Sequence, residues 1–83
     1  MFRIVSPTIF RERGFRFFFF SREEERKHVH VHCAAGEAKY WLEPGIELAR
    51  SHGLSATQLA RIRKIVEAHK DELIKAWNTH FGG

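Results

Sequence analysis

The run HVHVHC at residues 28–33 constrains the fold more than any other part of this chain. Histidine alternates there with valine and then with the single cysteine, and a period of two is typical of a β-strand whose two faces differ. Valine favours such a pleated, half-buried position. The run therefore predicts a strand that buries Val29 and Val31 and places its histidines on the opposite sheet face.

Three further runs have the character of strands or turns. SPTIFRERG and FRFFFFS are strand-like and meet at Arg13-Gly14, which fits a hairpin turn. EAKYWLEP follows the histidine strand and ends at a proline and a glycine. IELARSHG at residues 46–53 fits either a short strand or a helical turn.

The last third of the chain predicts a helix. Ser55 and Gln58 have the spacing of a capping box, in which each residue satisfies a free backbone N–H of the helix start. Apolar residues then recur along one stripe: Leu59, Ile62, Val66, Leu73 and Trp77. We therefore expect a single α+β domain over residues 1–83, with a small antiparallel sheet of about four strands packed by a C-terminal helix.

The helix is too long for the sheet it should cover. A continuous helix from Ala56 to His80 would measure about 37 Å, whereas a seven-residue strand covers about 23 Å. The helix must therefore break near His69 or project beyond the sheet, and no proline or glycine marks a break there. We expect projection, which would expose a partner interface made of Leu73, Ile74, Trp77 and Phe81.

A turn at Ala35-Gly36 would pair Val31 with Tyr40 on the core face and His30 with Trp41 on the other. The second face then forms a candidate binding surface, composed of Arg16, Phe18, Phe20, Lys39, Trp41 and Glu43 beside the histidines. The alternative is that the N-terminal segment or IELARSHG folds over this face.

Three kinds of chemistry fit the histidine face. His28 and His30 could act as general base or acid on an RNA 2′-hydroxyl, with Arg16 or Lys39 stabilising the charge of the phosphorane. The aromatic rings could stack RNA bases. Two imidazoles and Glu43 could also hold a metal ion, but no HExxH motif or cysteine pair accompanies them. We therefore assign no metal ligand and expect no cofactor.

The composition bears on location and partners. No apolar run approaches the ~20 residues that span a bilayer, and the start lacks the pattern of a secretory signal. One cysteine cannot form an internal disulfide, so a reducing cytoplasm with no membrane association is expected. The formal charge of +4 favours anionic partners.

Several motifs together resemble a family of small bacterial proteins catalogued as domain of unknown function 4160. They are PTIFRERGFRFFFFSREEER at 7–26, HVHV at 28–31, GEAKYWLEP at 36–44, GLSATQL at 53–59, and the ending at Trp77 and Phe81. By this resemblance, residues 1–6 look like an N-terminal extension. His32 lies outside the usual HVHV core, which leaves His28 and His30 as the candidate pair.

The resemblance implies a gene context in the manner of toxin–antitoxin pairs. The function expected from it is binding of a partner protein, either the neighbouring small protein or a second copy in a homodimer. The alternatives are an RNA-binding or RNA-cleaving toxin that uses the His28/His30 face, and a metal-binding domain.

Overall fold

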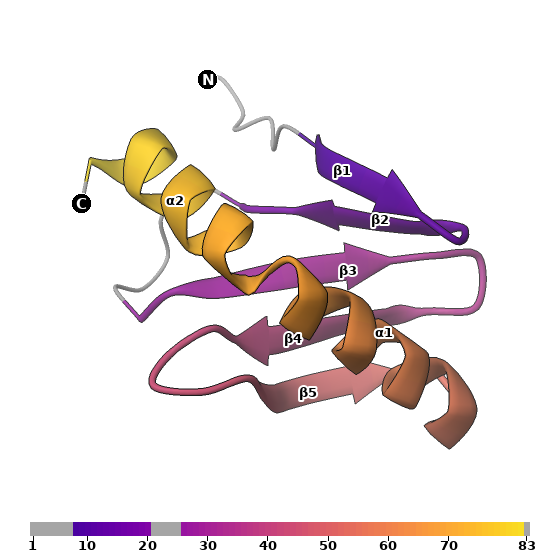
Figure 1. Ribbon diagram of the computed structural model, residues 1–83. Helices are drawn as coiled ribbons and strands as arrows, with labels where there is room; N and C mark the ends of the chain where they lie inside the picture. The colour runs from indigo at the N-terminus through magenta and orange to yellow at the C-terminus, as the bar shows by residue number, and fades with distance from the viewer. Residues whose placement is uncertain (1–7, 21–25, 83) are drawn as a thin grey trace.

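The computed structural model describes residues 8–20 and 26–82 as an α+β fold, in which two C-terminal helices lie on one face of an antiparallel sheet (Figure 1). In chain order the elements are β1 Thr8–Glu12, β2 Phe15–Phe18, β3 His28–His32, β4 Glu37–Trp41, β5 Glu47–His52, α1 Ala56–Ala68 and α2 Lys70–Phe81. The five strands are ordered in the sheet as in the chain. The predicted fold class is confirmed, with one strand more than expected. The extension predicted for residues 1–6 lies outside the described residues.

Both predicted hairpins form, but the second has a different register. Arg13 and Gly14 take positive φ angles of 53° and 85°, the geometry of a tight turn that matches strand twist. In the second hairpin the backbones of Cys33 and Gly36 bond to each other, so the loop is one residue earlier than predicted. Val29 consequently pairs with Tyr40 rather than with Leu42. This two-residue shift leaves every side chain on its expected face, because the side-chain period of a strand is two.

The segment that was ambiguous in the sequence becomes the edge strand β5. It pairs with β4, with an irregularity between Lys39 and Tyr40. The turn before β4 lies close to the C-terminal end of β5. A methyl group on Gly36 would collide with the His52 carbonyl oxygen and crowd Gly53. The residues of β5 are mostly exposed and show little strand pattern. Its place in the sheet therefore depends on its pairing with β4 and on the close approach of Gly36.

The helices lie over one face of the sheet, which Figure 1 shows from the helix side, and the two layers share a hydrophobic core. Val29 and Val31 are fully buried in it, which confirms the predicted direction of the histidine strand. Tyr40 lies in the same core and its hydroxyl donates to the Leu59 carbonyl, 3.0 Å away, so that sheet and α1 are joined by a hydrogen bond. Burial raises the pKa of the Tyr40 phenol.

The helical region starts as predicted and then bends. The Ser55–Gln58 capping box is present. The backbone leaves α1 at His69, whose φ and ψ are −108° and 17°, and α2 starts at Lys70. The prediction of a straight, projecting helix is wrong, and the alternative of a break near His69 is confirmed. None of the described helices is long and apolar enough to cross a membrane.

The bend brings the second half of the apolar stripe onto the sheet. Leu73 is 0% exposed and Trp77 4% exposed, and the Trp77 ring lies edge-on to Phe19 with 5.4 Å between centroids. Ile74 and Phe81 are half-buried against the same core. The four residues expected to form an exposed partner interface therefore include two core residues, which removes the basis for that interface.

Tertiary contacts of His69 hold the bend. Its Nδ1 lies 2.7 Å from a carboxylate oxygen of Glu72, and its Nε2 lies 3.0 Å from one of Glu12 on β1. The ring also stands 4.4 Å from the ring of Phe10. Both ring nitrogens can donate only in the imidazolium form. The hydrogen bond to Glu72, followed by that to Glu12, accordingly raises the pKa of His69 above its usual range.

Replacing His69 should make stability less dependent on pH. Because the folded-state pKa is raised, the stabilisation is fully present below the unfolded pKa of about 6.5 and is lost as the pH rises through the folded pKa. Urea unfolding of wild type and His69→Gln should therefore differ most between about pH 5 and 6, below the unfolded pKa of His69, by roughly 1 kcal/mol. The difference should shrink above neutral pH. His32→Gln, at an exposed position, is the control; an equal loss for His69→Gln at pH 5.5 and pH 9 would contradict the charged bridge.

Candidate functional site

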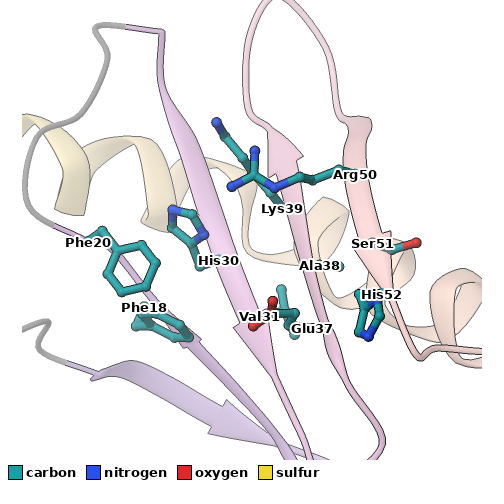
Figure 2. Close-up of a pocket in the computed structure, with 10 residues that line it drawn as sticks. All are labelled: Phe18, Phe20, His30, Val31, Glu37, Ala38, Lys39, Arg50, Ser51 and His52. Atoms are coloured by element: carbon teal, nitrogen blue, oxygen red, sulfur yellow. The ribbon is translucent and has the colours of Figure 1, made fainter.

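The sheet face turned away from the helices, called here the outer face, carries aromatic and basic side chains. Figure 2 looks onto it, with the helices behind the sheet. Its central members are Arg16, Phe18, His30, Lys39, Trp41 and Arg50, with Phe20 directly beyond β2. The predicted binding residues lie there except Glu43, which follows β4 and pairs with Lys27 at 3.6 Å.

A hollow of about 100 Å³ lies in the outer face. Phe18, Phe20 and His30 form one side of it, and Lys39 and Arg50 lie across from them (Figure 2). Its remaining lining comes from Val31, Glu37, Ala38, Ser51 and His52. The hollow thus combines aromatic rings from the end of β2 with charged side chains from β4 and β5.

The aromatic side of the hollow is a cluster of three rings, one of which is exposed to solvent. Phe20 lies edge-on to Phe18 at 5.3 Å between centroids and 4.4 Å from the imidazole of His30. Phe18 and His30 are themselves buried, whereas Phe20 is 44% exposed. Because its neighbours fix it, Phe20 offers a positioned aromatic surface to solvent.

Several cations on the outer face are held over aromatic rings. The Arg16 guanidinium stands 4.3 Å from the Phe18 ring centroid, and its Nε donates to the Thr8 hydroxyl at 2.6 Å. The ammonium of Lys39, a residue only 4% exposed, lies 4.6 Å from the Trp41 ring. Such cation–π contacts favour a fixed position for each charge.

Arg50 and Glu37 differ from these cations. Within residues 8–20 and 26–82 neither side chain makes a hydrogen bond or an ion pair. Arg50 is paired with Lys39 across the β4–β5 ladder, and Glu37 is paired with His52 two residues further along. The hollow therefore has a positive end and a negative end, each with a charge that is available to a ligand.

Of the three residues predicted to be catalytic, only His30 lines the hollow. His28 lies beside Trp41 as predicted, 5.7 Å between ring centroids, but it also contacts Trp77 of α2 at 5.0 Å and is buried. Its Nδ1 lies 2.7 Å from the Arg26 carbonyl oxygen. These contacts give His28 a packing role at the end of the sheet.

No group of three or more histidine, cysteine or acidic side chains that could hold a metal ion occurs in the described part of the chain. The alternating histidines of β3 are separated by what they contact: His28 reaches Trp77, His30 lines the hollow and His32 is exposed. The structure therefore lends no support to the metal-binding alternative.

Three lining residues with ionisable side chains were missed by sequence reasoning. Arg50 and His52 belong to β5, whose segment could not be identified as a strand, and Glu37 was assigned no role. The signal available was the spacing of Arg50 and His52, which puts both on one face once the segment is extended. Placing Arg50 and His52 beside Glu37 and Lys39 also required the pairing of β5 with β4.

The fold and site define a small α+β protein with helices on one sheet face and an aromatic, basic hollow on the other. Residues 14–78 match the family described as Domain of unknown function (DUF4160), and the chain belongs to that family. No curated protein and no solved structure matches the chain.

The contact between His28 and the Arg26 carbonyl predicts a tautomer. A carbonyl oxygen only accepts, so Nδ1 of His28 must carry a proton in the neutral imidazole as well as in the charged one. Two-dimensional ¹H–¹⁵N NMR of the histidine rings at alkaline pH should show His28 with a protonated Nδ1, with His32 as the exposed comparison. An unprotonated Nδ1 at alkaline pH would show that this hydrogen bond is absent.

Proposed function

We propose that the protein binds single-stranded RNA on its outer face. The observation that carries the proposal is the hollow in which the exposed Phe20 ring faces the Arg50 guanidinium, which has no hydrogen bond or ion pair within the described residues. Proteins that bind single strands combine aromatic rings, on which bases stack, with cations that contact the phosphates. A formal charge of +4 adds a general attraction for the RNA backbone.

The size of the hollow supports a single strand over a duplex. At about 100 Å³ it is nearer in size to one aromatic ring than to an element of a folded partner. Bases in duplex RNA are stacked and paired, whereas an unpaired base can turn outward onto an aromatic side chain. The hollow therefore suits a base from a loop, an end or an unstructured strand.

Binding of a partner protein is the second candidate, and the edge strand β5 favours it. One side of β5 has no neighbouring strand among the described residues, and Leu48 on it is 41% exposed. Exposed edges of this kind pair readily with strands of other chains. The occupant would be the neighbouring small protein of a toxin–antitoxin-like pair, or a second copy of this chain.

RNA cleavage is not part of the proposal. Cleavage would need a general base and a general acid on either side of the reacting phosphate, and His30 is the one predicted catalytic residue that lines the hollow. A cytoplasmic location is proposed with RNA binding, because RNA is abundant there and Cys33 is a free thiol.

Replacement of Phe20 or Arg50 should weaken RNA binding in different ways. Phe20→Ala removes a stacking ring and should weaken binding of a short labelled RNA of mixed sequence by roughly 5- to 150-fold. Arg50→Gln removes one phosphate contact and should lower the slope of affinity against salt by about 1. Fluorescence anisotropy at several salt concentrations measures both effects.

Lys75→Gln is the matched control, because Lys75 is an exposed cation on α2, on the opposite side of the sheet. It should leave the affinity close to that of wild type. The proposal fails if the wild-type protein does not bind the RNA, or if Phe20→Ala and Arg50→Gln bind as well as Lys75→Gln.

The partner proposal has its own variant. Leu48→Lys places a charge on the β5 edge and should disrupt strand pairing with another chain. Co-expression with the product of the neighbouring gene, followed by affinity capture and sedimentation, should show a complex or a dimer for wild type but not for Leu48→Lys. Arg61→Gln, at an exposed position of α1, is the control and should behave as wild type. A wild-type protein that sediments as a monomer and captures no neighbour would refute this candidate.

A further inference from the structure

We infer that the hollow selects cytosine over uracil, with Glu37 accepting a hydrogen bond from the amino group of the base and Arg50 contacting a phosphate of the strand. The inference rests on the proposed RNA binding and names the base that the site prefers. It follows from the size of the hollow, from the chemistry of its negative end, and from the separation between its two ends.

The size favours a single ring. The hollow measures about 100 Å³ and is bounded by the Phe18 and Phe20 rings on one side and by β4 and β5 side chains on the other (Figure 2). An apolar cavity that holds benzene measures about 150 Å³, so this smaller hollow is nearer in size to one ring than to two fused rings and would receive the ring in part. A pyrimidine therefore suits this space better than the two fused rings of a purine.

The negative end distinguishes the two pyrimidines. An ionised carboxylate accepts hydrogen bonds and cannot donate them, and in the described residues Glu37 has no partner of its own. Cytosine presents an amino group at C4, which donates, whereas uracil presents a carbonyl oxygen at the same position. Glu37 would bond to the amino group of cytosine and would repel the carbonyl oxygen of uracil.

The two ends are spaced for one nucleotide to contact both. Lys39 and Glu37 are two residues apart on β4, about 7 Å along the strand, and Arg50 is paired with Lys39. Figure 2 shows the Arg50 side chain extending from β5 across β4 toward Lys39. The base edge can thus lie toward Glu37 while the sugar-phosphate lies toward Arg50, with Phe20 beside the ring.

Short single-stranded oligocytidine and oligouridine of equal length test the inference at neutral pH. Anisotropy should show oligocytidine bound roughly 5- to 100-fold more tightly by the wild-type protein. Glu37→Gln replaces the carboxylate with an amide that both donates and accepts, so the preference should fall toward equal affinities. Asp71→Asn, which removes one exposed negative charge from α2, is the charge-matched control and should keep the wild-type preference.

The outcomes separate this inference from the proposed function. Equal binding of the two oligomers, with both weakened by Phe20→Ala, would overturn cytosine selection and leave RNA binding intact. Tighter binding of oligoadenosine than of oligocytidine would likewise overturn the choice of a single ring. A full preference retained in Glu37→Gln would overturn the role of Glu37. No binding of any oligomer would overturn both the inference and the proposed function.

Discussion

The packing of the helices on the sheet depends on the bend at His69, between α1 and α2. A five-stranded sheet that is apolar on one face needs cover along its whole width, and one straight helix cannot follow a twisted sheet. By turning at His69, the helical region places Ile62 and Val66 over one part of the sheet and Leu73 and Trp77 over another. The imidazole joins this turn to Glu12 of β1, at the far edge of the sheet.

Because the helices cover one face, the other face of the sheet is left without a helix layer. The same alternation that buries Val29 and Val31 turns His30 outward, and the same β2 strand that buries Phe17 sets Phe18 on the outer side. Cations of the outer face then make cation–π contacts with its aromatic rings, as Arg16 does with Phe18. The alternation of side chains along β2 and β3 therefore produces both the core on one face and the candidate site on the other.

β5 adds a second cation and a further histidine to the hollow. β2 and β3 supply aromatic rings, β4 supplies Lys39 and Glu37, and the edge strand supplies Arg50, a cation without an ion pair among the described residues. The tight approach of Gly36 to the end of β5 holds that strand at a fixed position beside β4.

The sequence by itself determined the fold class, the two hairpins, the capped helix start and the burial of Val29 and Val31, because these depend on local periodicity and turn chemistry. It also determined that Phe18, Phe20, Lys39 and Trp41 share a face with the histidines. Only the tertiary structure decided the helix bend, the burial of Trp77 and the role of β5. His69 and Arg50 acquire their roles from residues distant in the chain, and contacts of that kind leave no local pattern in the sequence.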